Sequence, residues 1–208
     1  SGSAHPEKIA QKVKSLKADI GIALDGDADR CTIVDENGNI VNGDLILAII
    51  SSDWKEKGKL SKKTVVGTVM SNSAFETYLK ELGISFVRTA VGDRNIIAKM
   101  QEKKYVLGGE PSGHIILGQY SSTGDGILAS LEILGIMKEK NKKLSELSNL
   151  FIPYPQIIED YTINNKYNGN ILNIAKNKID ELKKEAHGKC RLIIRKSGTE
   201  SKIRIMAE

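Results

Sequence analysis

The middle of the chain alternates between short apolar runs and longer segments with helical spacing, and this alternation limits the fold more than any other feature. Short apolar runs bounded by turn residues predict buried strands, whereas apolar residues three and four positions apart predict helices. Strands that alternate with helices are typical of an α/β layer built partly on parallel pairing. The expected strands cover 64–69, 84–88, 105–108 and 114–117, and the expected helices cover 73–82, 93–103 and 125–138.

Further segments stand on both sides of this layer. Before it, apolar runs flank an acidic loop; after it, Pro153 and Pro155 suit a linker, because proline cannot continue a helix. The segments expected outside the layer are a helix beginning at Pro6, strands at 18–24 and 31–34, a helix at 43–54, strands at 156–163, 191–195 and 203–206, and a helix at 168–184. We therefore expect an α/β protein that ends in a small α+β module.

Three aspartates occupy alternate positions directly after the first apolar run. They are Asp25, Asp27 and Asp29, with Arg30 next to the last of them. Side chains two positions apart in an extended chain point the same way, so three like charges would repel one another unless a cation lay among them. A hard divalent ion with oxygen ligands, most naturally Mg²⁺, fits this donor set. The small residues between the aspartates let the backbone bend around the ion, and Arg30 adds a fixed positive charge.

The acidic loop also allows two other interpretations: a metal-dependent sugar-phosphate phosphatase that uses Asp25, and a turn with no catalytic role. In an aspartyl phosphotransferase site, Asp25 would be the nucleophile and Asp27 the acid–base group. The loop could also be an acidic turn in contact with solvent. An EF-hand is excluded, because Arg30 stands where that loop requires glycine and strands rather than helices are expected on both sides.

A second group of polar residues lies in the turn at 108–114, which reads Gly-Gly-Glu-Pro-Ser-Gly-His. Glu110 and Ser112 offer an acceptor and a hydroxyl that suit paired sugar hydroxyls. The imidazole of His114 suits proton transfer. The alternative is a hairpin turn whose polar residues only cap backbone groups.

Two loops precede helices. Asp93 and Asp125 are placed to accept the first free amides of those helices, and N-caps are the expected roles of both. Arg94 is less expected at a helix start, because the helix dipole disfavours a cation there. Arg94 is therefore a candidate contact for an anion.

A further cluster follows one of the last expected strands. Arg195, Ser197, Gly198 and Thr199 combine a guanidinium group, two hydroxyls and a flexible backbone, and Arg204 follows on the next strand. Such a set can hold a phosphate through bidentate bonds, hydroxyl donors and exposed amides. A polar hairpin turn is the alternative.

Composition excludes several classes of protein. The net charge of +5 is mild and spread along the chain, and the 3 Phe, 1 Trp and 6 Tyr are not grouped with the basic residues, so no nucleic-acid surface is indicated. Cys31 and Cys190 have neither metal-binding nor redox spacing. No apolar run has the length of a membrane span and no signal peptide is visible. A cytoplasmic protein is expected, with no membrane partner.

These clusters occur in one order: the acidic loop, then Gly-Glu-x-Ser-Gly-His, then Arg-x-Ser-Gly-Thr-Glu. The ordered set resembles the α-D-phosphohexomutase family, and within it the bacterial members that act on glucosamine phosphates. The resemblance covers essentially the whole chain. It implies the end of a second α/β domain at 1–41, a complete sugar-binding third domain with a mixed sheet at 42–150, and a phosphate-binding α+β fourth domain at 151–208.

The family moves a phosphoryl group between O6 and O1 of a hexosamine through a bisphosphorylated sugar and a phosphoserine in the first domain. The implied partners are thus a sugar phosphate and the N-terminal domains. The resemblance implies Asp25, Asp27 and Asp29 as Mg²⁺ ligands, Arg30 and His114 as catalytic residues, and Glu110, Ser112, Arg94, Arg195, Ser197, Gly198, Thr199 and Arg204 as substrate-binding residues.

The chain departs from the family pattern at two points. Ser201 replaces the proline that commonly follows Gly-Thr-Glu, and no serine nucleophile loop of the first-domain type is found. We therefore expect no turnover by this chain alone, and weak affinity for Mg²⁺. Gly198 favours the glucosamine members, because the mannose and glucose phosphate mutases often carry Asn there; those mutases stay open as an alternative.

Overall fold

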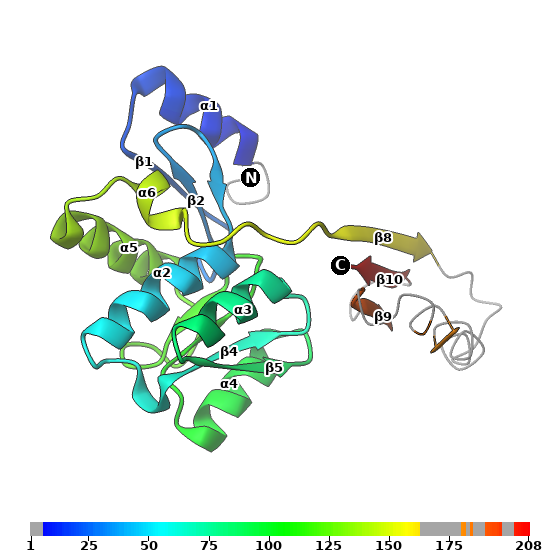
Figure 1. The fold of residues 1–208 in the computed structure, drawn as a ribbon. Helices are drawn as coiled ribbons and strands as arrows, with labels where there is room; N and C mark the ends of the chain where they lie inside the picture. The colour runs from blue at the N-terminus through cyan, green and yellow to red at the C-terminus, as the bar shows by residue number, and fades with distance from the viewer. Residues whose placement is uncertain (1–5, 163–179, 182–183, 185–189, 197–201) are drawn as a thin grey trace. The chain divides into compact units, whose positions relative to one another are not determined.

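The computed structural model describes residues 6–162, 180–181, 184, 190–196 and 202–208, which form two compact units (Figure 1). The first unit is residues 1–153 and the second is residues 154–208. The expected domains at 1–41 and 42–150 both fall within the first unit. Among the residues that the structure describes, no helix is both long and apolar enough to cross a bilayer.

A small antiparallel sheet opens the first unit, with strand order β1-β2-β3. Helix α1 packs closely on β1: a Cβ at Gly21 would lie 2.5 Å from Val13 Cγ2, so this contact requires glycine. The carboxylate of Asp35 closes the turn after β2 by accepting from the amides of Asn37 and Asn39, at 2.9 and 2.8 Å. The elements are α1 (Pro6–Leu16), β1 (Ile20–Leu24), β2 (Cys31–Asp35) and β3 (Ile40–Val41).

A four-stranded mixed sheet forms the centre of the first unit, in the order β5-β4-β6-β7. Strand β4 pairs in parallel with β5 and β6, and β7 is antiparallel to β6. The expected mixed α/β sheet is confirmed. Its strands are β4 (Thr64–Thr68), β5 (Ser85–Thr89), β6 (Leu107–Gly109) and β7 (Ile115–Leu117).

Helices cover both faces of this sheet. Helices α2, α3 and α5 supply residues to the larger core, which includes Trp54, Phe75 and Ile133. Helix α4 lies on the other side of β4 and β5 from α3 (Figure 1) and packs through Ile96 and Met100 in a separate small core. The helices are α2 (Gly43–Glu56), the 3₁₀ turn η2 (Ser61–Lys63), α3 (Ser73–Glu81), α4 (Asp93–Lys103), α5 (Gly126–Lys140) and α6 (Leu144–Ser148).

Of the two predicted N-caps, one is confirmed and the other is not. Asp125 is confirmed as the N-cap of α5, with Oδ1 accepting from the amides of Ile127 and Leu128 at 2.9 Å each. The prediction for Asp93 was wrong. Gly92 is the N-cap of α4 with φ +118°, a conformation that favours glycine, and Asp93 is the first helical residue.

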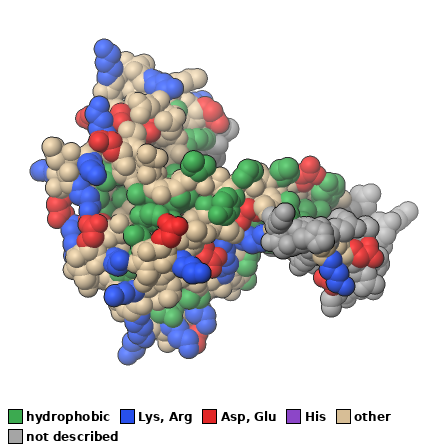
Figure 2. Space-filling view, viewed as in Figure 1, with side chains coloured by type: hydrophobic (Ala, Val, Ile, Leu, Met, Phe, Trp, Pro, Cys, Tyr) green, Lys and Arg blue, Asp and Glu red, His purple; other side chains and the backbone are tan. Residues whose placement is uncertain are grey.

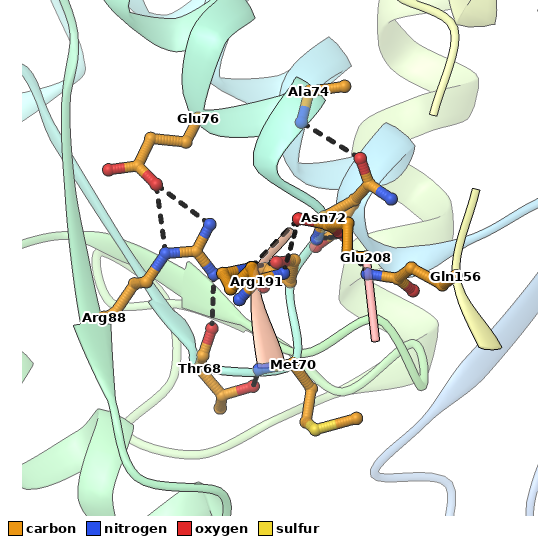
Figure 3. Close-up of polar contacts among 11 residues, drawn as sticks. Thr68, Met70, Asn72, Ala74, Glu76, Arg88, Gln156, Arg191 and Glu208 are labelled. Atoms are coloured by element: carbon orange, nitrogen blue, oxygen red, sulfur yellow. Dashed lines mark hydrogen bonds and ion pairs between the residues drawn. The ribbon is translucent and has the colours of Figure 1, made fainter. Parts of the chain in front are cut away.

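The second unit contains an antiparallel sheet in the order β8-β10-β9. Arg191 and Glu208 extend the β9–β10 pair by two backbone hydrogen bonds and an ion pair of 2.9 Å, and Gln156 also bonds Glu208 (Figure 3). Most of the helix expected at 168–184 lies outside the described residues. The strands are β8 (Ile157–Thr162), β9 (Leu192–Lys196) and β10 (Lys202–Ala207).

Surface charges of both signs are interspersed on the face of the first unit that Figure 2 shows. One charged residue of this unit, Glu36 in the β2–β3 turn, accepts hydrogen bonds from the hydroxyl and the amide of Ser145 at the start of α6. Burial raises the pKa of Glu36, but the bonds from Ser145 outweigh it and hold the pKa below its ordinary value of 4.5. The carboxylate form is therefore the one that the fold favours.

Replacing Glu36 by Gln is expected to cost about 1 kcal/mol at pH 7. A lowered pKa means that the unfolded chain binds more protons near pH 4.5, so this contribution is present above that pH and is lost as the pH falls below it. Denaturant unfolding at about pH 7 and about pH 3.5 measures it: Glu36→Gln should lose less stability on acidification than wild type. Glu81→Gln, an exposed carboxylate on α3, is the control. Equal pH dependence in wild type and Glu36→Gln would contradict the assignment.

Candidate active site

The acidic loop brings its three aspartates together. One carboxylate oxygen from each of Asp25, Asp27 and Asp29 lies within 4.8 Å of the other two. The expectation that an extended chain aligns them was wrong. Residues 25–30 form a tight loop in which the amide of Ala28 bonds the carbonyl of Asp25 at 3.4 Å, and Ala28 takes the left-handed φ of +58°. The aspartates converge because the chain turns back on itself.

Arg30 balances part of the negative charge. Its Nε lies 3.9 Å from Asp25 Oδ2 and 3.9 Å from Asp29 Oδ1, and its amide donates to Asp25 Oδ1 at 3.1 Å. Burial, followed by the hydrogen bond and charge of Asp25, raises the pKa of Asp29. Burial also raises the pKa of Asp25, but the hydrogen bond with Asp29 and the Arg30 contacts outweigh it, so that pKa is lowered. These opposite shifts are expected of like charges held close together.

His114 contacts the acidic loop from the buried side, through Asp29. Its Nδ1 is 3.0 Å from Asp29 Oδ2, and the residue is only 1% exposed. Gly124 covers the ring so closely that a Cβ there would lie 2.3 Å from it. A buried ring bonded to Asp29 is placed to orient that carboxylate. The proton-transfer role of His114 stays a prediction.

Backbone hydrogen bonds fasten the acidic loop to the turn at 110–114. The amide of Cys31, the residue directly after the acidic loop, donates to the carbonyl oxygen of Gly113 at 3.1 Å. The amide of Gly43 at the start of α2 donates to the carbonyl oxygen of Pro111 at 3.1 Å and holds the same turn from a second side. Two glycines permit this approach: a Cβ at Gly113 would lie 2.0 Å from the Cys31 carbonyl oxygen, and one at Gly43 would lie 1.9 Å from the Glu110 carbonyl oxygen. The two loops therefore keep a fixed spacing.

Glu110 connects this turn to the start of α4. It is 9% exposed; Oε1 accepts from the amide of Gly92 at 3.1 Å, and Oε2 lies 3.4 Å from Ser112 Oγ. The turn is thus a β6–β7 hairpin in which Glu110 does bond a backbone amide, as the alternative interpretation held. Ser112 lies beside Glu110 in the turn, and Arg94 is in the first turn of α4, two residues after the Gly92 amide that Glu110 accepts from.

The predicted phosphate-binding residues belong to the second unit. Arg195 on β9 and Arg204 on β10 are directly paired in the sheet register. Arg204 binds Asp160 of β8 through Nε and Nη2, each at 2.7 Å, and this bond lowers the pKa of Asp160. Ser197, Gly198 and Thr199 lie outside the described residues. The structure therefore brings the acidic loop, His114, Glu110 and Ser112 together in one unit, and describes the two arginines separately.

The glycines that allow the loops to meet were not identified as functional from the sequence. Gly113 is part of the motif at 108–114, and Gly92 and Gly124 directly precede the predicted N-caps Asp93 and Asp125. A glycine before a cap gives no sign of which distant chain segment approaches it, so only the folded structure reveals these contacts.

Comparison with models of known protein families gives three matches, which together cover most of the chain. Residues 42–154 match the model of phosphoglucomutase/phosphomannomutase alpha/beta/alpha domain III, residues 3–38 match domain II, and residues 158–208 match the C-terminal domain.

Relatives and solved structures agree with these matches. The phosphoglucosamine mutases of Caldanaerobacter subterraneus and Nitrobacter winogradskyi are 50% and 46% identical over this whole chain, which covers 47% and 46% of their lengths. The chain thus spans about half the length of these relatives. A phosphoglucomutase/phosphomannomutase family protein from Burkholderia thailandensis has a similar fold, with a TM-score of 0.76, 21% identity, and coverage of 99% of this chain and 46% of that one.

A second solved structure, Aspergillus fumigatus N-acetylphosphoglucosamine mutase in complex with GlcNAc-6P and magnesium, has a TM-score of 0.73 at 21% identity. It is matched over 96% of this chain and 48% of that one, and the likeness concerns the fold. With a family model matched over more than half of its residues, the chain belongs to the phosphoglucomutase/phosphomannomutase family, the α-D-phosphohexomutases.

Proposed function

We propose that this chain is the second half of a phosphoglucosamine mutase. The whole enzyme would convert glucosamine 6-phosphate into glucosamine 1-phosphate through a bisphosphorylated sugar, with a phosphoserine supplied by a domain outside this sequence. The main support is the fastening of the acidic loop to the Glu110 turn through Cys31–Gly113 and Asp29–His114. This arrangement would keep a cation site and a sugar site at a fixed spacing.

Asp25, Asp27 and Asp29 would hold Mg²⁺. The residues fit the ion, because three carboxylate oxygens lie close together and the pKa of Asp29 is raised by burial and by its like-charged neighbour. When bound, Mg²⁺ would neutralise charge on the transferred phosphoryl group and orient it. Arg30 adds a positive charge at the edge of the loop, and His114 keeps Asp29 in position.

The sugar would bind at the Glu110 turn. Gly92 holds one oxygen of Glu110, and the other lies beside the hydroxyl of Ser112, so this pair can accept from and donate to adjacent sugar hydroxyls. Arg94 would contact a phosphate. These contacts do not depend on which end of the sugar carries the reacting phosphate, so one site can serve both half-reactions.

The phosphate that is not transferred would bind the second unit. We assign the main contact to Arg195, with Ser197, Gly198 and Thr199 beside it in the sequence. Arg204 would play a supporting part, because its guanidinium already forms a bidentate pair with Asp160.

The test uses the full-length polypeptide that contains this sequence, with Mg²⁺ and a bisphosphate primer. Conversion of glucosamine 6-phosphate, followed by ³¹P NMR, is expected for that polypeptide and absent for this chain alone. Faster conversion of mannose or glucose phosphates would assign the enzyme to those members of the family. Release of inorganic phosphate that Asp25→Asn abolishes would instead support the aspartyl phosphatase alternative.

Replacing Asp27 by Asn is expected to weaken Mg²⁺ binding about tenfold or more, because it removes one of three charged ligands. Asp27 is exposed, so the fold should be retained. Isothermal titration of this chain with Mg²⁺ measures the affinity, and Asp19→Asn, an aspartate outside the loop, is the matched control. If Asp27→Asn binds Mg²⁺ as strongly as wild type, the acidic loop is not the metal site.

A further inference from the structure

Arg88 on β5 holds a loop that none of the sequence motifs includes, the β4–α3 loop at 69–72. Its Nη1 donates to the carbonyl oxygens of Thr68 at 3.2 Å and Ser71 at 2.7 Å (Figure 3). Its Nε and Nη2 donate to the same oxygen of Glu76 on α3, at 3.0 and 2.9 Å. One guanidinium group thus connects both ends of the loop to the following helix.

Further bonds fix the same loop from two sides. The amide of Val69 donates to the carbonyl of Thr89 at 2.9 Å, and the amide of Asn72 donates to the buried carboxylate of Asp44 on α2 at 2.8 Å. Ser71 and Asn72 are buried, whereas Val69 and Met70 are partly exposed. The loop therefore presents a rigid apolar tip, formed by Val69 and Met70.

The strand order places this tip on the same edge of the sheet as the Glu110 turn. Strands β5, β4 and β6 are adjacent and parallel, so the loops after their carboxyl ends share one edge of the sheet. The β4 loop begins at the end of the strand that lies between β5 and β6; the loop after β5 contains Gly92, and the turn after β6 contains Glu110. The amide of Gly92 donates to Glu110 Oε1 at 3.1 Å, so the loops that follow the two strands next to β4 are joined directly. In open α/β sheets, ligands bind at this carboxyl edge.

We infer that Arg88 is a positioning residue for the sugar-phosphate site, because it fixes the Val69–Met70 tip at the sheet edge that also bears the two substrate loops. This inference rests on the proposed function. Only arginine can make these contacts at once, since its planar fork donates in several directions, whereas a lysine ammonium is a single point. The Arg88 side chain is 19% exposed and stacks over the ring of Phe86 at 5.0 Å, which limits its movement.

The experiment compares Arg88→Lys with wild type in the full-length enzyme, at a temperature where both are fully folded. We expect kcat/KM for glucosamine 6-phosphate to fall about tenfold or more, mainly through a higher KM, because the sugar is held less accurately. Hydrogen exchange at the amides of 69–72 should also become faster. Lys99→Gln removes a different ion pair, with Glu102 on α4, and is expected to change kcat/KM less than about twofold.

A second variant covers the case in which Arg88→Lys does not fold. Glu76→Gln keeps the bonds from Arg88 to the two carbonyls and weakens only the anchor on α3, so a smaller rise in KM, about threefold, is expected. A lower melting temperature with unchanged KM and unchanged exchange in both variants would overturn the inference and leave the proposed function intact. No turnover by the wild-type full-length protein would overturn both.

Discussion

Replacing Gly113 by alanine is expected to separate the Glu110 turn from the acidic loop and to lower mutase activity about 100-fold or more. The new Cβ would lie 2.0 Å from the Cys31 carbonyl oxygen, and Gly113 has φ +90°, which L residues rarely adopt. Both segments are backbone, so neither can move aside without breaking the Cys31–Gly113 hydrogen bond of 3.1 Å. We expect a loss of about 3 kcal/mol in the free energy of unfolding.

Gly58→Ala is the matched control for this substitution. Gly58 also has positive φ, at +68°, but a Cβ added there would have no neighbouring atom within 4 Å, so the change adds backbone strain without a clash. It should cost about 1 kcal/mol and leave activity unchanged. Denaturant unfolding gives the stabilities, and turnover of glucosamine 6-phosphate by the full-length polypeptide gives the activities. Equal effects of the two variants would show that the loop contact has no special role.

Replacing Trp54 by alanine is expected to destabilise the first unit by about 4 kcal/mol, a large share of a typical folding free energy. Trp54 on α2 is 0% exposed, and its indole Nε1 donates to Glu132 Oε1 on α5 at 2.6 Å. Its ring also meets Tyr120 edge to face, with centroids 6.2 Å apart. The substitution would therefore leave a cavity between two helices and remove the polar link between them.

Trp54→Phe separates the two contributions. It keeps most of the buried ring but loses the donor to Glu132, which is partly exposed and can bond water instead. A loss of about 1–2 kcal/mol is expected. Urea unfolding followed by circular dichroism measures it, because Trp54 is the single tryptophan and its fluorescence is lost in both variants. A loss under about 1 kcal/mol for Trp54→Ala would mean that the core closes around the gap.

Much of the fold followed from apolar spacing alone. The helix expected at 93–103 has those bounds in the structure, and the mixed sheet formed from the four expected strands. Such segments are predictable because burial on one face imposes a period on the sequence. Helix α6 and the short strand β3 were not expected, because a few residues are too short to display a period.

The site was predictable in its residues but less so in its geometry. The aspartates were identified, yet their convergence depends on the left-handed turn at Ala28, which no spacing rule reveals for a residue with a side chain. Arg88 gave no signal at all, because two of its partners are backbone carbonyls, which every residue carries. Contacts made through backbone atoms are therefore the part of this site that could not be predicted from the sequence.

The position of the division between the two compact units has a consequence for exchanging segments among relatives. The family models change at residues 38–42, yet the chain on both sides of that point belongs to one unit, joined by the acidic loop and the Glu110 turn. A hybrid gene joined there would pair two surfaces that did not evolve together. Crossing over after Pro153 instead transfers each unit with its own internal bonds, and hybrids of that kind should yield well-folded protein more often.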